Sequence, residues 1–185
     1  MSTKDRWLLP EGVEEILPAD ARRAEALRRG LLDLFEGWGY ELVMPPLIEY
    51  LESLLVGAGS EFDLQTFKVT DLLTGRLMGM RPDMTPQAAR IDAHYLKRSA
   101  PVRLCYAGAV LRTRPDEFGG SREPLQFGAE LFGYAGSQAD AEILSLMIAA
   151  LRLADIREAH IDLGHVGVFR GLAAQANLGA EREKD

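Results

Sequence analysis

The feature that most constrains the fold is a pair of long apolar segments separated by a short polar connection. The segments cover residues 102–113 and 125–134, and the connection between them reads RPDEFGGSREP. Gly, Pro and charged residues of this kind interrupt strands and form turns. Each flanking segment has the length and composition of a buried strand. The pattern predicts a large antiparallel hairpin with a mobile tip.

The rest of the chain supplies helices and several shorter strands. Asp20 is the predicted N-cap of a first helix whose apolar residues recur at helical spacing. We expect helices at residues 21–38, 49–56, 85–98, 139–154 and 166–175, and strands at 41–44, 65–70, 76–80 and 159–163. This order predicts an α+β fold with a mostly antiparallel sheet flanked by helices. Because the sequence shows no repeat or low-complexity linker, we expect residues 1–185 to form one domain.

Composition excludes several classes of protein. With 47% hydrophobic and 26% charged residues, the chain is typical of globular proteins and unlike disordered or collagenous ones. The net charge of −7 argues against a large RNA-binding surface, since nucleic-acid binders usually carry a basic face. No segment contains the roughly 18 apolar residues that span a bilayer, and the N-terminus lacks an apolar signal core. We therefore expect a cytoplasmic protein with no membrane partner.

Cysteine and histidine give no indication of a metal site. Cys105 is the single cysteine, so neither a disulfide nor a thiolate metal site is expected, and a small buried hydrophobe is the simplest interpretation. His94, His160 and His165 lack metal-ligand spacing, which favours structural or surface positions.

Polar residues occupy one face of the second hairpin segment. Gln126, Gly128 and Glu130 share this face because strand side chains alternate with a period of two. The glycine leaves space for a small ligand, and the two polar side chains can bind an ammonium or imidazole donor. A solvated sheet face explains the same spacing, and the sequence leaves both possibilities open.

Three arginines, Arg112, Arg114 and Arg122, lie at or beside the hairpin tip. Arginines on a mobile loop suit recognition of phosphate or carboxylate through paired hydrogen bonds. The sequence alone favours a simpler alternative, in which they balance nearby acidic residues, namely Asp116, Glu117 and Glu123.

The junction from Arg81 to Pro86 joins a predicted strand to a predicted helix. Asp83 or Thr85 is expected to cap this helix. Helix N-termini also present free amides to ligands, so the same junction is a candidate pocket wall.

These segments together resemble a known family. GWGYELVMPPLIEY, residues 37–50, resembles motif 1 of class II aminoacyl-tRNA synthetases, a helix and strand that end in proline and form the dimer interface. LRTRPDEFGGSREPLQFGAELFG, residues 111–133, resembles motif 2 of histidyl-tRNA synthetases, and GSQADAEILSL resembles the next helix of that family. The resemblance covers nearly the whole chain. It implies a fold like the catalytic core of a class II aminoacyl-tRNA synthetase.

Two branches of this family differ at positions that the chain contains. Residues 80–85 read MRPDMT in place of the synthetase pattern LRPEGT. Arg114 stands two residues after Arg112, where synthetases carry a glutamate that helps to hold adenine. Such a charge reversal disfavours adenylation, which depends on electrostatic positioning. These features, with RPDMTPQAARI and LGHVGVFRGL, resemble the regulatory subunit of ATP phosphoribosyltransferase, a synthetase paralogue of histidine biosynthesis.

The resemblance implies a non-catalytic function. The regulatory subunit is required for activity and for histidine feedback of the first step of histidine biosynthesis. The implied partners are the short-form catalytic subunit, a second copy through the motif 1-like region, and histidine. Neither tRNA nor a cofactor is expected. The alternative is histidyl-tRNA synthetase or a fragment of it, which activates histidine and charges tRNA.

The resemblance also implies a ligand pocket without catalytic residues. Arg112 matches the arginine that faces the ligand carboxylate or ATP phosphate, and Asp83 replaces a glutamate that is one methylene longer. The positions that match the surroundings of the histidine ligand are Asp83, Thr85, Gln126 and Glu130. The predicted sheet requires more strands than the chain supplies, and further pocket residues of the family would follow Asp185. We therefore expect a truncated form of this core.

Overall fold

The computed structural model describes residues 7–57, 59–115 and 120–175. The chain forms two compact units, Met1–Asp155 and Ile156–Asp185. The second unit contains one helix, α6 (Val166–Gln175), among its described residues, as the sequence predicted. The expectation that residues 1–185 form one domain stays a prediction. The candidate residues all lie in the first unit.

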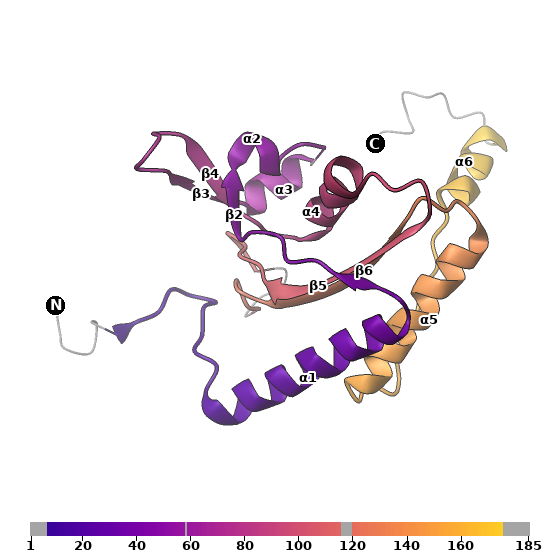
Figure 1. Cartoon of the computed structure of the whole chain (residues 1–185), viewed down its shortest axis with the longest axis horizontal. Coiled ribbons are helices and arrows are strands. Elements are labelled where there is room, and N and C mark those ends of the chain that lie inside the picture. Colours follow the sequence, from indigo (N-terminus) through magenta and orange to yellow (C-terminus); the bar gives the residue numbers. More distant parts are fainter. Residues whose placement is uncertain (1–6, 58, 116–119, 176–185) are drawn as a thin grey trace. The chain divides into compact units, whose positions relative to one another are not determined.

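The predicted hairpin is the centre of the first unit (Figure 1). Strands β5 (Val102–Ala109) and β6 (Leu125–Phe132) pair antiparallel over their whole length. A short strand, β1 (Glu41–Leu42), pairs with β5 in parallel and completes a sheet of order β1-β5-β6, called the hairpin sheet below. The expected mobile tip includes residues 116–119, which lie outside the described residues.

A second sheet forms beside the first, so the single predicted sheet is corrected to two three-stranded ones within the described residues. Strands β2 (Ile48–Tyr50), β4 (Leu77–Met80) and β3 (Phe67–Thr70) pair antiparallel in the order β2-β4-β3. Helices α2 (Leu51–Leu54) and α3 (Ser60–Gln65) accompany this sheet. The hairpin expected at residues 65–70 and 76–80 is confirmed.

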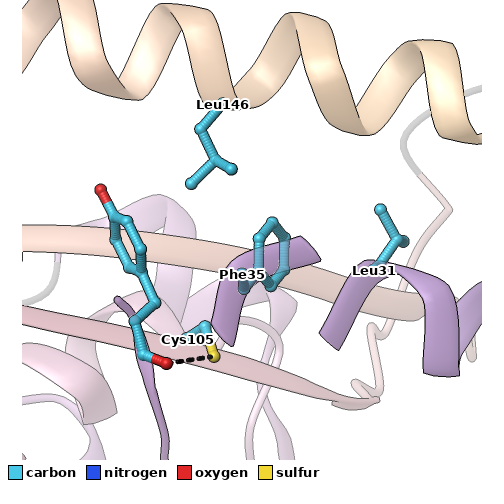
Figure 2. Packing of buried hydrophobic residues seen from close by; sticks show 5 residues of the cluster. Leu31, Phe35, Cys105 and Leu146 are labelled. Atoms are coloured by element: carbon cyan, nitrogen blue, oxygen red, sulfur yellow. Dashed lines mark hydrogen bonds between the residues drawn. The ribbon is translucent and has the colours of Figure 1, made fainter. Parts of the chain in front are cut away.

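Two helices cover one face of the hairpin sheet. They are α1 (Pro18–Gly37) and α5 (Ser137–Leu153), and both lie below β5 and β6 in Figure 1. The buried side chains between them and the sheet are Leu31, Phe35, Tyr40, Cys105 and Leu146, shown in Figure 2. Cys105 is only 2% exposed, so its interpretation as a buried hydrophobe is confirmed. Burial raises the pKa of its thiol to about 11.

The opposite face of the hairpin sheet carries helix α4 (Thr85–Arg90). A π-helix, η2 (Ile91–Leu96), continues α4, and Lys97 ends it in the left-handed region with φ of 48°. A second buried cluster packs here and contains Met84, Ala88, Tyr106 and Val110. Gln126 and Glu130 lie on this face and are half-buried, so it is not the fully solvated face that the sequence left open.

Helix α1 begins two residues before the predicted cap. Leu17 occupies the N-cap and makes no side-chain cap hydrogen bond, while Asp20 lies in the first turn. Proline explains the earlier start, because its fixed φ and missing N–H suit the first helical position.

Two further sequence predictions require correction. The helix expected at residues 49–56 is shortened to α2, because Ile48–Tyr50 extends along β4 as a strand. Residues 159–163, predicted as a strand, have no regular secondary structure. A strand exists only where a neighbouring strand satisfies its backbone hydrogen bonds, and alternating side chains alone do not provide that neighbour.

Candidate functional site

The junction between β4 and α4 is fixed by a buried arginine. Arg81 is 7% exposed, and its guanidinium donates hydrogen bonds to the carbonyl oxygens of Pro45 at 2.5 Å and Ala109 at 3.0–3.1 Å. Burial lowers the pKa of Arg81 from its usual value, but an arginine remains protonated at neutral pH. These bonds join the end of β4 to β5 and to the segment before β2. The junction that holds the candidate residues is therefore rigidly anchored.

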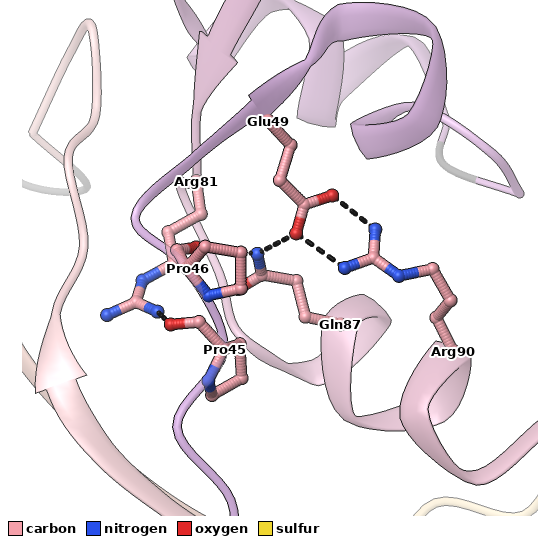
Figure 3. Close-up of polar contacts among 6 residues, drawn as sticks. All are labelled: Pro45, Pro46, Glu49, Arg81, Gln87 and Arg90. Carbon is pink, nitrogen blue, oxygen red and sulfur yellow. Dashed lines mark hydrogen bonds and ion pairs between the residues drawn. The ribbon is translucent and has the colours of Figure 1, made fainter. Parts of the chain in front are cut away.

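A second polar group anchors α4 (Figure 3). The Glu49 carboxylate of β2 accepts hydrogen bonds from Arg90 and Gln87, and Gln87 also donates to the Pro46 carbonyl at 2.8 Å. Burial by itself would raise the pKa of Glu49, but the hydrogen bonds from Arg90 and Gln87 outweigh it and lower that pKa. The ion pair thus fixes the axis of α4 against the second sheet.

Asp83 and Gln126 connect the start of α4 to β6. Asp83 Oδ1 accepts hydrogen bonds from the Thr85 amide and from Gln126 Nε2, both at 2.8 Å. Gln126 Oε1 in turn accepts one from the Met84 amide at 2.9 Å. The expected N-cap at Asp83 or Thr85 is corrected, because Met84 occupies that position and forms no side-chain cap hydrogen bond, while Asp83 binds the first helical amide from one residue earlier. Since a carboxylate can accept about four hydrogen bonds, Asp83 retains capacity for a ligand donor.

Thr85 and Glu130 are connected through a residue that the sequence analysis missed. The hydroxyl of Tyr106 donates to Glu130 Oε1 at 3.0 Å and lies 2.8 Å from Thr85 Oγ1. Tyr106 is 2% exposed, and burial raises the pKa of its hydroxyl well above the usual value. The hydroxyl consequently stays protonated and remains a donor to the carboxylate.

The ring of Tyr106 occupies the space that the sequence analysis assigned to a ligand above Gly128. The two residues are direct partners across the hairpin, and a Cβ added to Gly128 would lie 2.2–2.4 Å from three ring and hydroxyl atoms of Tyr106. Gly128 is therefore required because a side chain there would collide with the Tyr106 ring, and it does not leave open space for a ligand. An alternating pattern in the first segment places Tyr106 on this face, but pairing it with Gly128 requires the register of the hairpin.

The arginines at the tip differ in their contacts. Arg112 Nε donates to the Pro82 carbonyl at 3.2 Å, and Arg112 lines a cavity of about 290 Å³ together with Gln126. Arg122 donates to the carbonyl oxygens of Arg112 and Glu11, each at 3.2 Å, and its guanidinium lies 4.9 Å from the Phe67 ring centroid. Arg122 thus joins neighbouring segments. Arg114 is exposed.

The five candidate residues form one connected site. Asp83 and Gln126 bind each other, Thr85 and Glu130 share the Tyr106 hydroxyl, and Arg112 binds the backbone beside Asp83. We call this group the candidate pocket. Within the described ranges, no three His, Cys, Asp or Glu side chains come together as metal ligands. Among the same residues, no helix has the length and hydropathy needed to cross a membrane.

Comparison with known proteins identifies the family of the chain. The model of the family described as histidyl-tRNA synthetase matches residues 12–185. The ATP phosphoribosyltransferase regulatory subunit of Alkalilimnicola ehrlichii is 62% identical over 98% of this chain and 45% of its own length. The subunit of the same name from Pseudomonas syringae pv. syringae is 60% identical over 100% of the chain and 47% of its own length. The chain therefore spans just under half the length of these relatives.

Solved structures agree with this relationship. A Bacillus halodurans protein, described as an ATP phosphoribosyltransferase regulatory subunit/histidyl-tRNA synthetase, has a TM-score of 0.71 and 34% identity, and the match covers 83% of this chain and 40% of that one. A histidine–tRNA ligase subunit of Alicyclobacillus acidocaldarius has a TM-score of 0.68 and 30% identity over 80% of this chain and 42% of its own. The predicted class II synthetase-like fold and the resemblance to the regulatory subunit are confirmed. The chain belongs to the histidyl-tRNA synthetase family.

Proposed function

We propose that this chain forms part of a regulatory subunit of ATP phosphoribosyltransferase. The observation that carries the proposal is the 60–62% identity to relatives of that name over nearly all of the chain. In the proposed assembly, a short-form catalytic subunit condenses ATP with phosphoribosyl pyrophosphate, and histidine inhibits the reaction. The cytoplasmic location expected from the sequence stays a prediction.

Arg114 supports a non-catalytic function for this chain. In the synthetase pattern that the chain resembles, motif 2 has a glutamate at this position. This chain has an exposed arginine there, which carries the opposite charge. A cation there removes the acceptor that would hold adenine, and misplacement of a nucleotide weakens adenylation strongly because the reaction depends on positioning. We propose that the chain has kept the amino-acid side of the synthetase site and lost its nucleotide side.

We further propose that histidine binds in the candidate pocket. The Asp83 and Glu130 carboxylates suit the ammonium and imidazole N–H groups of histidine, and Arg112 suits its carboxylate. Histidine can inhibit only if it binds differently to the active and inhibited states of the assembly. Glu130→Ala is expected to weaken feedback, whereas Glu142→Ala, which removes a carboxylate bound to Tyr40 and Arg103, leaves it unchanged. Equal feedback in both variants and the wild type would contradict the pocket.

The motif 1-like region is proposed as a homodimer interface. Several apolar side chains in this region are poorly covered by the first unit, and Met44 is 86% exposed. Large groups of exposed apolar side chains mark interaction surfaces in soluble proteins. Met44→Glu in the full-length protein should shift its sedimentation toward the monomer. An unchanged dimer would place the interface elsewhere.

One experiment tests the regulatory function directly. The full-length protein is mixed with a short-form catalytic subunit, and formation of phosphoribosyl-ATP is measured with and without histidine. We expect the mixture to be more active than the catalytic subunit alone and to be inhibited by histidine. If the protein neither binds the subunit nor changes its rate, the proposal is wrong.

Histidyl-tRNA synthetase is the second candidate function, because the matching family model carries that description. It predicts that the full-length protein exchanges pyrophosphate into ATP when histidine is present. Exchange at a rate above the background of Arg112→Ala would support this alternative. Its absence in an assay where a known synthetase is active would exclude it.

A further inference from the structure

Tyr106 stands at the point where the two sides of the candidate pocket meet. One side is the start of α4, with Thr85, and the other is β6, with Glu130. The Tyr106 hydroxyl lies 2.8 Å from Thr85 Oγ1 and 3.0 Å from Glu130 Oε1. Tyr106 connects them from β5, a third element, and its own position is fixed by the glycine beneath its ring.

Packing alone explains the ring of Tyr106 but not its hydroxyl. The ring fills an apolar cluster with Met84, Ala88 and Val110, and phenylalanine would fill it equally well. A buried hydroxyl is unfavourable unless it forms hydrogen bonds, and here both of its neighbours are candidate pocket residues. The hydroxyl therefore forms its hydrogen bonds with residues of the candidate pocket, and the apolar cluster does not require it.

The direction of the hydrogen bonds determines what the pocket can accept. The tyrosine proton is directed to Glu130 Oε1, since a carboxylate only accepts. The hydroxyl oxygen then accepts from Thr85 Oγ1, which fixes that side chain as well. Glu130 is thereby held in one orientation, and its remaining lone pairs are available only to a donor.

We propose that Tyr106 is a positioning residue that orients the Glu130 carboxylate toward an N–H group of the histidine imidazole. The inference rests on the proposed histidine pocket and extends it, because it names the residue that determines selectivity for a ring with an N–H donor. Tyr106 acts through Glu130 and does not itself need to contact the ligand. An analogue whose ring has no N–H gains nothing from this orientation.

The chain supplies a matched control on the other face of the hairpin sheet. Tyr40 is 3% exposed, and its hydroxyl donates to the Glu142 carboxylate at 3.0 Å. Tyr40→Phe therefore removes the same kind of buried hydrogen bond at the same distance, away from the pocket. Any loss of histidine affinity that arises from general destabilisation should appear in both tyrosine variants.

The test measures ligand binding by calorimetry to the full-length protein assembled with its catalytic subunit. The ligands are histidine and an analogue with a thiophene ring in place of imidazole. Tyr106→Phe should weaken histidine binding by about 3- to 10-fold, the usual effect of one lost hydrogen bond, and leave analogue binding unchanged. Tyr40→Phe should change neither. In a Glu130→Gln background, Tyr106→Phe should have little further effect, since coupled residues are not additive.

Several results would overturn the inference. One is an unchanged histidine affinity in Tyr106→Phe, and another is an equal loss of affinity for histidine and for the analogue. An equal loss of histidine affinity in Tyr40→Phe would also do so, as would a full effect of Tyr106→Phe in the Glu130→Gln background. If Tyr106→Phe does not fold, Thr85→Val removes the other contact of the hydroxyl and must reproduce the selective loss. Wild-type protein that binds no histidine would instead refute the proposed pocket itself, which distinguishes the two failures.

Discussion

Gly128→Ala is the substitution for which the structure gives the clearest expectation. The added methyl carbon would lie 2.2 Å from Cζ, 2.3 Å from the hydroxyl oxygen and 2.4 Å from Cε2 of Tyr106. Favourable carbon–carbon contacts in proteins are about 3.5–4.0 Å, so the ring must move by roughly 1 Å or more. Tyr106 is 2% exposed and packs tightly, so no open space receives it.

The magnitude follows from three contributions. Overpacking of a buried site lowers the free energy of unfolding by about 1–3 kcal/mol. Displacement of the ring also removes the hydrogen bonds of its hydroxyl with Thr85 and Glu130, which contribute about 1 kcal/mol each. Replacement of glycine by alanine also restricts the unfolded chain, and this raises the free energy of unfolding by about 0.5 kcal/mol. The net loss is therefore about 2.5–4.5 kcal/mol.

Urea unfolding of the full-length protein measures this loss as a lower midpoint. Gly37→Ala is the control, because Gly37 lies in the last turn of α1 and an added Cβ meets nothing within 4 Å. It should leave stability unchanged or raise it slightly. In a Tyr106→Ala background, Gly128→Ala should lose most of its effect. A loss below about 0.5 kcal/mol, or the same loss without the Tyr106 ring, would refute the steric argument.

Three further predictions concern buried titratable groups. Glu49→Ala leaves the Arg90 guanidinium without its partner and should lower the free energy of unfolding by about 3 kcal/mol in urea. Glu25→Ala should barely change it, because the side chains of the Arg28–Glu25 pair are 38% and 42% exposed. The pKa of Glu49 is lowered in the fold, so its stabilisation is present above the unfolded pKa of about 4.3 and lost as pH falls through the folded value. Thermal unfolding from pH 7 to 3 should thus show a steeper acid loss in the wild type than in Glu49→Gln, and parallel curves would contradict this. Cys105, buried and with a thiol pKa of about 11, should resist iodoacetamide at pH 8 until the protein unfolds, and rapid labelling of its peptide by mass spectrometry would contradict the burial.

Local sequence patterns predicted the elements that depend on local physics. The apolar segments around RPDEFGGSREP form β5 and β6, and the amphipathic pattern at residues 139–154 forms α5 with a shift of one or two residues. Each element buries a face that its own residue spacing defines, so no knowledge of its neighbours was needed. The same alternation placed Gln126 and Glu130 on one side of β6.

Features that depend on pairing between distant segments were not predictable in this way. Residues 159–163 alternate like a strand but have no regular structure, and residues 48–50 pair with β4 although a helix was expected from residue 49. Tyr106 was missed for a related reason. Its contact with Gly128 follows from the hairpin register, and a long connection between two strands does not determine that register.

Two of the departures from the synthetase pattern, Asp83 and Arg114, differ in their contacts. The Asp83 carboxylate accepts a hydrogen bond from the backbone amide of Thr85, two residues later in the chain. An aspartate side chain, with one methylene, has the length that this local contact requires. Asp83 also binds Gln126 of β6, so the shorter acid still connects the start of α4 to the hairpin sheet. Arg114 is exposed near the hairpin tip. Its charge is opposite to that of the glutamate that the resemblance implies at this position, which is why we proposed that the nucleotide side of the site is lost. In the proposed function, the carboxylates Asp83 and Glu130 would bind an amino acid, and Arg114 replaces the one expected to hold a nucleotide. This combination supports the regulatory proposal over the synthetase.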